Sequence, residues 1–381
     1  SRRPWTWFCA DVPSVLFVSK PVAPPFRDGS ICLVRDLALH LERVRPIVMA
    51  TADAPELGGN VVVERIYPQK GGYAPALRDN ARAFARLLVG ARPSLWHFVF
   101  APNPRSSLAA HVARMVRRVP CVQTIASAPR RFEGLGRLLF GDRIVALSEH
   151  TRRRLVQAGA DAKRIHVIGP TVPSSSLMSS ASEEATRAAL ALPRDAQLVV
   201  YPGDLEVSSG ARLVAEAADA ILARTDAVLV YACRKKTQRA SRIEAELASR
   251  LRHHGERVRF VGEVPSLPGL LRLATLVLFP VEDLYGKVDV PIALLEAMAL
   301  GVPVIAADRG PLAEVEGVVH AHLESDGLAR LAADLLRDER RRAELAQRGR
   351  EIVRTQYAPA RGAARYEELY DELVRARAER R

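Results

Sequence analysis

The chain has 381 residues, of which 48% are hydrophobic, and this size predicts a folded protein with two domains of roughly 150 to 200 residues each. Its four cysteines are scattered, with no CxxC pair and no histidine cluster at zinc-ligand spacing, which argues against a disulfide scaffold or a structural zinc ion and favours reduced thiols in the cytoplasm. The net charge is +13, and no uninterrupted apolar run of about 18 residues is present, so we expect a soluble or peripheral protein.

The positive charge is concentrated in the first half. Residues 1–180 hold 26 Lys and Arg against 12 Asp and Glu, whereas residues 181–381 hold 30 against 31. A basic half can attract nucleic acid, anionic lipid headgroups or a phosphorylated substrate. Alternatively, the 50 arginines against six lysines reflect a general bias toward arginine. Because the basic clusters are not interleaved with stacking aromatic residues, no nucleic-acid partner is expected.

The first half alternates short apolar strands with helical patterns. Strands are expected over 14–19, 46–51, 60–67, 94–102, 120–127 and 142–148, with a last strand and its exit over 164–173, and helices over 31–43, 77–89, 107–118 and from residue 149 onward. Strands separated by helices of ten or more residues imply parallel βαβ units with helices on both faces of the sheet. We therefore predict a doubly wound α/β domain over residues 1–174.

The second half repeats this alternation after a serine-rich linker at residues 174–182. Strands are expected over 197–203, 227–233, 258–264, 276–280 and 302–308, with helices over 210–224, 238–253, 266–273 and 291–300 between them. We predict a second Rossmann-like domain over residues 175–355, facing the first across a ligand cleft. A final helix within residues 356–381, with Tyr366, Leu369, Tyr370 and Leu373 on one face, is expected to pack back on the first domain.

The helix over residues 291–300 carries the clearest functional signal. Asp289 and Pro291 predict its start, with Asp289 as an acidic cap, and Gly301 predicts its end. Glu296 is the only charged side chain between Val290 and residue 307, so we expect it to be largely buried. A buried carboxylate needs hydrogen-bond donors, which a ribose diol would supply and which backbone amides, a hidden arginine or solvent could also supply.

The stretch DVPIALLEAMALGVPVIAADRGPLAE resembles the signature of family 4 glycosyltransferases of the GT-B fold. The similarity is close from Leu294 to Ala306, and the segments DRIVALSEHTRRRL, KRIHVIGPTVP and RFVGEV are similar to other parts of that fold. The resemblance implies two Rossmann-like domains facing across a cleft and a retaining, metal-independent transfer of a sugar from a nucleotide-sugar donor. No Asp-x-Asp triplet occurs in the sequence, and neither a metal ion nor another cofactor is expected.

The resemblance assigns donor-site roles to several residues. Glu296 matches the glutamate that binds the ribose, and Asp289 stands one residue after the position of the family's first glutamate, which is Val288 here. Asp289, Glu296 and Lys287 are therefore the expected catalytic residues. The expected donor-binding residues are Gly203, Arg234, Lys235, Lys236, Gly262, Val264, Val290 and Glu296.

The sequence departs from the family pattern at the phosphate site. The arginine and lysine that usually contact the donor diphosphate are replaced by Asp204 and Ser209. Arg234, Lys235, Lys236 and Lys287 are the candidates for compensating charge, and solvated loop charges are the alternative. The histidine often found after the fifth strand is absent too, and Ser127 is the nearest polar residue.

The first domain is expected to bind the acceptor, which we expect to be a glycan, a lipid-linked sugar or a small molecule. Gly29 and Ser30 match the family's acceptor and phosphate loop weakly, and Ser127 completes this set. The segment RRFEGLGRLLFG at 130–141 is expected to be either a core-facing helix or an interfacial segment on an anionic membrane. The sequence thus predicts a cytoplasmic enzyme of polysaccharide biosynthesis, with peripheral membrane association as one possibility. A non-catalytic nucleotide-sugar-binding subunit and a GT-B nucleotide-sugar epimerase are the alternatives.

Overall fold

The computed structural model describes residues 12–26, 28–68, 76–127, 129–173, 177 and 182–379. The chain forms two compact units. The N-terminal unit comprises residues 1–146, 154–168 and 359–381, and the C-terminal unit comprises residues 147–153 and 169–358. The chain passes from the first unit to the second after residue 168, and a short segment after the sixth strand, residues 147–153, also belongs to the C-terminal unit.

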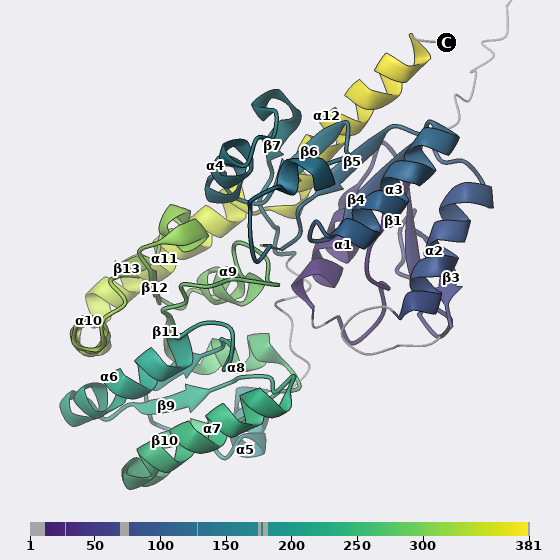
Figure 1. Ribbon diagram of the computed structural model, residues 1–381. Coiled ribbons are helices and arrows are strands. Elements are labelled where there is room, and N and C mark those ends of the chain that lie inside the picture. The colour runs from purple at the N-terminus through teal and green to yellow at the C-terminus, as the bar shows by residue number, and fades with distance from the viewer. Residues whose placement is uncertain are drawn as a thin grey trace, which may run out of the picture. The chain divides into compact units, whose positions relative to one another are not determined.

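The N-terminal unit contains a seven-stranded parallel sheet with the strand order β3-β2-β1-β4-β5-β6-β7 (Figure 1). Its strands are β1 (Ser14–Val18), β2 (Arg45–Thr51), β3 (Val62–Tyr67), β4 (Leu95–Val99), β5 (Cys121–Thr124), β6 (Arg143–Ala146) and β7 (Ile165–Val167). Its helices are α1 (Gly29–His40), α2 (Leu77–Val89), α3 (Pro104–Arg117), α4 (Glu149–Gln157), whose first residues belong to the other unit, and α12 (Pro359–Ala378).

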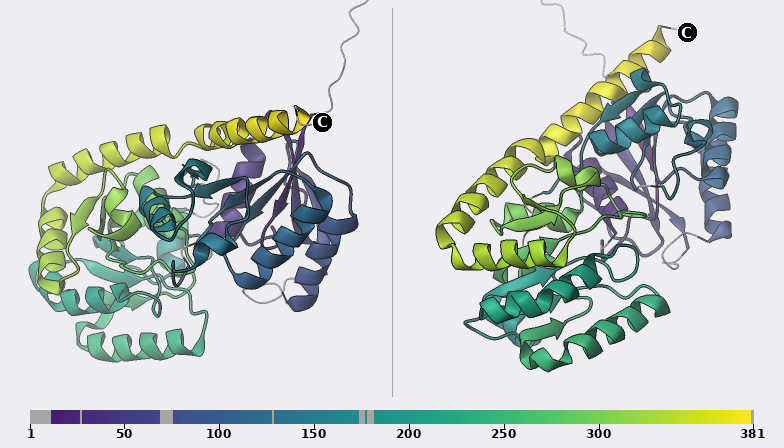
Figure 2. Two further views of the ribbon diagram at one scale, coloured as in Figure 1. Left: turned by 45° about the horizontal axis from the view of Figure 1, so that its top comes forward. Right: turned by 60° about the vertical axis from the view of Figure 1, so that its left-hand side comes forward.

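The C-terminal unit contains a six-stranded parallel sheet with the order β10-β9-β8-β11-β12-β13. Its strands are β8 (Leu198–Tyr201), β9 (Val228–Tyr231), β10 (Val258–Phe260), β11 (Ala274–Phe279), β12 (Val304–Ala307) and β13 (Val319–Ala321). Its helices are α5 (Glu183–Ala189), α6 (Gly210–Arg224), α7 (Gln238–Leu251), α8 (Leu267–Leu273), α9 (Ile292–Ala299), α10 (Ser325–Arg337) and α11 (Glu339–Gln356). Figure 2 shows α10 and α11 joined at a sharp corner.

The prediction of two doubly wound α/β domains is confirmed, since both sheets are parallel and have helices on both faces. In the C-terminal unit, α6 contacts α7 and α10, whereas α8 contacts α5 and α9. Right-handed crossovers place these two groups on opposite faces, because the chain moves outward from β8 through β9 to β10 and then returns to β11. The helices α5, α10 and α11 and the strand β13 were not predicted from the sequence.

Helix α12 packs beside α1 on one face of the N-terminal sheet. Right-handed crossovers place α2 and α3 on one face, and α1 lies on the other. Helix α12 contacts α1, β4 and β5. Its Tyr366, Leu369, Tyr370 and Leu373 are buried, which is the face that the sequence predicts.

A buried polar cluster joins α12 to the sheet. His97 on β4 is fully buried, its Nδ1 lies 2.7 Å from the hydroxyl of Tyr370, and its Nε2 lies 2.7 Å from Oγ1 of Thr124 on β5. The hydroxyl of Tyr366 lies 3.2 Å from the same threonine oxygen. Burial lowers the pKa of His97 to about 3, so the ring is neutral at physiological pH.

The segment 130–141 is neither a long helix nor an exposed apolar face. It contains one short 3₁₀ turn, Leu135–Leu138. Leu135, Leu139 and Phe140 are buried in the N-terminal unit, and the Arg154 guanidinium lies over the Phe132 ring at 4.4 Å from its centroid. The interpretation of this segment as interfacial is therefore wrong, because its apolar side chains pack into the core. Among the described residues, no helix is both long and apolar enough to span a bilayer.

Candidate functional site

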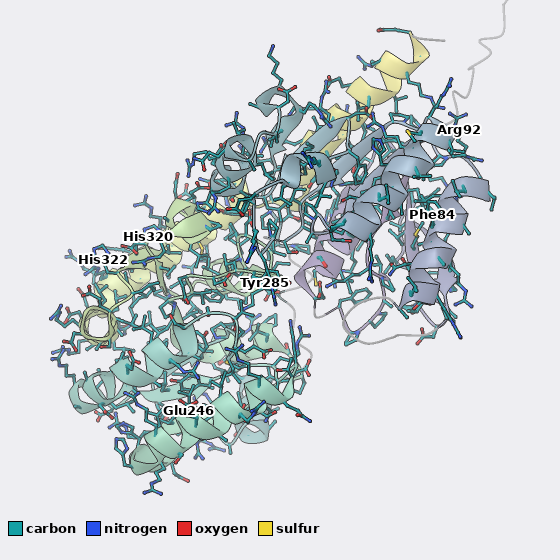
Figure 3. The ribbon with its side chains drawn as sticks, viewed as in Figure 1. Phe84, Arg92, Glu246, Tyr285, His320 and His322 are labelled. Carbon is teal, nitrogen blue, oxygen red and sulfur yellow. The ribbon has the colours of Figure 1, made fainter. Side chains whose placement is uncertain are left out.

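The C-terminal unit has its topological switch point between β8 and β11, which are neighbours in the sheet. Connections leave these two strands toward opposite faces, and in open α/β sheets the resulting crevice at the carboxyl ends is the usual ligand site. The loop after β8 contains Gly203 and Asp204, and the connection from β11 to α9 contains Lys287 and Asp289. Tyr285, labelled in Figure 3, lies on this second connection. Four residues that the sequence singles out thus follow adjacent strands at one edge.

A salt bridge joins the two connections at the switch point. The Lys287 ammonium pairs with Oδ2 of Asp204, and both side chains are largely shielded from solvent. The other carboxylate oxygen of Asp204 accepts hydrogen bonds from the backbone N–H groups of Glu206 at 2.9 Å and Val207 at 2.5 Å. Burial raises the pKa of Asp204, but the Lys287 charge and these hydrogen bonds outweigh it, so the pKa lies below its ordinary value. Asp204 is therefore a carboxylate that orders its loop and holds Lys287.

Gly203 is required at the end of β8 because the Tyr201 ring lies under the loop. A Cβ at position 203 would lie 2.2 Å from a ring carbon of Tyr201 and 2.3 Å from its hydroxyl oxygen. That hydroxyl donates a hydrogen bond of 2.9 Å to the Asp204 carbonyl. Farther along the loop, the Ser209 N–H donates to Oε1 of Glu282 at 2.6 Å, which is a second link across the switch point.

The expected role of Asp289 as a helix cap is wrong. Helix α9 begins at Ile292, and its N-cap is Pro291, whose side chain makes no capping hydrogen bond. The Asp289 side chain is instead fully buried, and its Oδ2 accepts a 2.7 Å hydrogen bond from the hydroxyl of Ser148. Its Oδ1 has no hydrogen-bond partner within the described residues. Burial raises the pKa of Asp289, and the Ser148 hydrogen bond opposes this shift.

Ser148 is a residue of this site that the sequence did not indicate. It belongs to the segment Leu147–Arg153, which is part of the C-terminal unit. Its hydroxyl accepts a hydrogen bond from the Thr151 N–H at 3.1 Å while donating to Asp289. In the same segment, Arg153 pairs with Glu314 at 2.6 Å. The resemblance of this segment to family members was the available signal, but it assigned no partner.

The buried position of Glu296 is confirmed, because only 9% of the residue is exposed. It lies in the second turn of α9, among the buried side chains of Leu294, Leu295 and Met298. Val290 is buried in the same core. The helix is eight residues long and begins directly after the segment that carries Lys287 and Asp289. The structure thus places the three expected catalytic residues on one continuous stretch of chain.

The other expected cations follow β9. Arg234 lies 4.0 Å from Glu263, and Lys235 pairs with Glu244 of α7 at 2.7 Å, whereas Lys236 is exposed. The Thr237 hydroxyl donates to Glu206 at 2.5 Å and thereby links this loop to the loop after β8. The basic loop is therefore adjacent to the switch-point loop, and its charges are partly balanced by acidic side chains.

The turn after β10 contains the remaining donor-site candidates. Gly262 has a φ of +64°, a conformation that favours glycine, and Val264 is buried against the core. This turn also holds Glu263, the partner of Arg234. The loops after β8, β9 and β10 therefore lie at the same carboxyl edge of the sheet.

The acceptor candidates lie in the N-terminal unit. Gly29 and Ser30 open α1 after β1, which is at the switch point between β1 and β4. Asp28 caps this helix by accepting from the Ser30 N–H at 3.0 Å, and it pairs with Lys20 at 2.9 Å. Burial raises the pKa of Asp28, but Lys20 and Ser30 outweigh it, and the pKa is lowered. Ser127 lies three residues after β5 and is partly buried.

Comparisons with known proteins match both halves of the chain. Residues 33–175 match the model described as "Glycosyltransferase Family 4", and residues 196–338 match the model described as "Glycosyl transferases group 1". The chain is 32% identical over 128 residues to N-acetyl-alpha-D-glucosaminyl L-malate synthase from Bacillus anthracis. This match covers 32% of either chain, so it spans about a third of that relative's length.

Two solved structures show the same fold along nearly the whole chain. Sucrose-phosphate synthase from Thermosynechococcus elongatus has a TM-score of 0.77 at 20% identity, covering 96% of this chain and 100% of that one. The Anabaena protein HepE in complex with UDP and glucose has a TM-score of 0.73 at 19% identity, covering 95% and 100%. At this level of identity the likeness concerns the fold alone.

Proposed function

Because the chain belongs to family 4 of the glycosyltransferases and has the GT-B fold, we propose that it transfers a sugar from a nucleotide-sugar donor, with retention of configuration and without a metal ion. The observation that carries this proposal is the Lys287–Asp204 pair at the switch point. The diphosphate of a donor needs compensating positive charge in such a site.

The pair accounts for the departure at the phosphate site. Where relatives usually have an arginine after the glycine of β8, this chain has Asp204, which holds a lysine from the neighbouring connection. An ammonium group has three donors, and the pair with Asp204 uses one of them. We propose that the other two bind the donor diphosphate, and that Arg234 and Lys236 supply further charge.

Helix α9 and the segment before it supply the rest of the proposed donor site. In the proposal, Glu296 accepts hydrogen bonds from the ribose hydroxyls, as the family resemblance implies. Asp289 borders the donor sugar in the proposal, and its Oδ1, which is buried and has no hydrogen-bond partner among the described residues, reaches a sugar hydroxyl once the surrounding segment moves. Gly262 and Val264 line the base. The leaving diphosphate is stabilised by Lys287, so no metal ion is needed at this position.

The acceptor is proposed to be anionic and to bind the N-terminal unit through the loop of Gly29 and Ser30 and through Ser127. The basic first half of the chain supports this proposal, because its positive field attracts anions. The Bacillus anthracis relative is named for a malate product, which makes a small anionic acceptor the first class to test. A lipid-linked or glycan acceptor of polysaccharide biosynthesis is the other class.

A peripheral association with the inner face of the membrane is supported by helices α2 and α3, which pack against each other. They expose five large apolar side chains, namely Leu77, Val89, Leu108, Met115 and Val116. Arg78, Arg82 and Arg105 are exposed on the same two helices. Exposed apolar groups beside cations fit an anionic lipid surface. Sedimentation with vesicles containing anionic lipid tests this, and equal binding to neutral vesicles would contradict it.

The donor site is tested by thermal melting with UDP-, GDP-, ADP- and dTDP-sugars on the wild type, Glu296→Ala and Lys287→Ala. A ligand at about 100 times its dissociation constant stabilises a protein by about 2.7 kcal/mol, which raises the melting midpoint by a few degrees. UDP-sugars come first, since HepE was solved with UDP. Both variants are expected to lose the shift, and Lys163→Ala, which removes an exposed lysine from the N-terminal unit, is expected to keep it.

Turnover separates the remaining alternatives. A transferase releases the nucleotide when an acceptor is added and forms a glycoside whose anomeric configuration, measured by NMR, matches that of the donor. An epimerase would change the sugar without any acceptor. A binding subunit would show donor-dependent stabilisation without release of nucleotide under any condition. A product with inverted configuration would refute the retaining mechanism while leaving the donor site intact.

A further inference from the structure

A cluster of two histidines and one aspartate lies on the C-terminal unit away from the donor-site candidates. Asp219 is on α6, and His253 and His254 follow α7 in the short 3₁₀ segment Arg252–Arg257. Helices of a doubly wound sheet run antiparallel to their strands, so the end of α7 lies at the amino edge of the sheet. The donor-site candidates lie at the carboxyl edge. The cluster is therefore separate from the proposed chemistry.

The three side chains converge on one point. His253 Nε2 lies 3.0 Å and His254 Nε2 2.6 Å from the same oxygen, Oδ1 of Asp219. The three potential ligand atoms all lie within 4.8 Å of one another. The two imidazole rings are 4.0 Å apart between centroids, which holds both Nε2 atoms toward the carboxylate.

The hydrogen bonds of His253 favour a cation at this point. Its Nδ1 lies 3.2 Å from the Arg250 carbonyl oxygen, while its Nε2 faces Asp219. A neutral imidazole has one N–H and cannot donate to both oxygens, so either a second ring proton or a metal ion must occupy the side that faces Asp219. When a metal ion takes the place of the Nε2 hydrogen, Nδ1–H donates to the carbonyl and the ring is oriented as in most histidine metal ligands. The backbone thus already provides the outer hydrogen bond of a ligating histidine.

We propose that Asp219, His253 and His254 form a binding site for a divalent transition-metal ion such as Zn²⁺, with water in the open position. Two imidazoles and one carboxylate are ligands that this class of ion accepts, whereas Mg²⁺ and Ca²⁺ prefer oxygen. Tetrahedral zinc with bonds of about 2.0 Å needs ligand atoms about 3.3 Å apart, so the imidazole nitrogens, which lie 3.0 Å and 2.6 Å from Oδ1 of Asp219, must move outward by less than about 1 Å to admit the ion. Asp219 and His253 are more than half exposed, so small rotations adjust the geometry.

The site would clip α6 to the end of α7. These helices already contact each other, and Arg212 of α6 lies 3.3 Å from Glu246 of α7, which is labelled in Figure 3. A metal bridge would add a link between Asp219 and a pair of residues 34 and 35 positions later in the chain. The expectation of no metal ion thus stays a proposal for the donor site, and this surface site is additional to it.

Titration calorimetry with ZnCl₂ tests the proposal on the full chain without a polyhistidine tag, after removal of metal with EDTA. The wild type is expected to bind one equivalent saturably. His253→Ala/His254→Ala is expected to lose this binding, and Asp219→Asn to weaken it at least tenfold. The matched control is His111→Ala, which removes an exposed histidine from α3 and is expected to bind like the wild type. Circular dichroism checks that each variant is folded.

Two outcomes would overturn the proposal. One is a wild-type titration that shows no saturable binding isotherm with ZnCl₂ concentrations up to roughly 1 mM, at which binding is too weak for a specific site. The other is binding by the double-histidine variant with wild-type stoichiometry and affinity. A second measurement uses Co²⁺, whose visible absorption is intense when four-coordinate. An intense spectrum that the double variant lacks supports the site, and competition by MgCl₂ at equal concentration contradicts its nitrogen ligands.

Discussion

Acidification is expected to destabilise the N-terminal unit through His97. The ring is fully buried, and its pKa in the folded protein is about 3, against 6.5 for an ordinary histidine. Because the unfolded chain binds this proton and the folded chain does not, the contribution of His97 is fully present above pH 6.5. It is lost progressively as the pH falls from about 6.5 toward 3.

The size of the effect follows from this shift. At pH 5.0, which is 1.5 units below the ordinary histidine pKa of 6.5, the ring is protonated in the unfolded chain and neutral in the folded one. Each pH unit below 6.5 costs the folded state about 1.36 kcal/mol. The free energy of unfolding of the N-terminal unit should therefore fall by about 2 kcal/mol between pH 7.5 and pH 5.0 because of His97 alone. Asp36 of the same unit, whose pKa is raised by burial, contributes in the opposite direction, so the effect must be isolated by comparing variants.

Urea unfolding followed by tryptophan fluorescence is a suitable assay. With Trp5 and Trp7 replaced by Phe, the signal comes from Trp96, which is buried on β4 beside His97. His97→Gln is expected to lose the 2 kcal/mol difference between the two pH values. Tyr370→Phe, which removes a hydrogen-bond partner but leaves the ring buried, is expected to keep it at a lower overall stability. Parallel pH dependence in the wild type and His97→Gln would refute the reasoning.

Three further changes test the packing of both units. Gly203→Ala should lower the unfolding free energy by about 1–3 kcal/mol, because the added Cβ would overlap the Tyr201 ring. The control is Gly327→Ala in α10, where the added Cβ meets open space, and this change should be neutral or slightly stabilising. Urea titrations that give similar effects for both variants would argue against the overlap. Glu367→Ala should lower the unfolding free energy by about 2–4 kcal/mol, because this carboxylate of α12 accepts hydrogen bonds of 2.6 and 2.7 Å from two backbone N–H groups that follow α1. Glu367→Gln keeps one acceptor oxygen and should recover part of that loss. Asp289→Asn should raise the unfolding free energy at pH 7.5, because a carboxylate with a raised pKa destabilises the fold once it is ionised. A gain that persists unchanged at pH 4 would contradict this cause.

Most elements of both sheets could be predicted from the sequence because each depends on local periodicity. Short apolar runs bounded by turn residues indicate buried parallel strands, and all strands except β13 overlap the runs that the sequence predicts. The helix α10 was missed, although its buried Leu328, Ala332, Leu335 and Leu336 have helical spacing, so the signal was present. The helix expected at 130–141 was wrong, because core burial there is achieved by a 3₁₀ turn rather than a regular helix.

Some features of the candidate site could be predicted from the sequence, and others could not. The burial of Glu296 follows from its apolar neighbours in sequence, and the placement of Lys287 and Asp289 at a strand end follows from the strand pattern. Their partners do not, since Asp204 is 83 residues from Lys287 and Ser148 is 141 residues from Asp289. The sequence suggested a helix cap for Asp289, and tertiary structure replaced it with a hydrogen bond from a distant loop.

The sequence by itself determined that this protein is an α/β chain of two doubly wound domains, with a buried carboxylate in a short apolar helix. Only the tertiary structure decided which residues meet. Tyr370 lies beside His97 across 273 positions, and Asp219 lies beside His253 across 34. The physical reason is that hydrophobic periodicity records which face of an element is buried, whereas the order of strands and the side of each crossover decide what it is buried against.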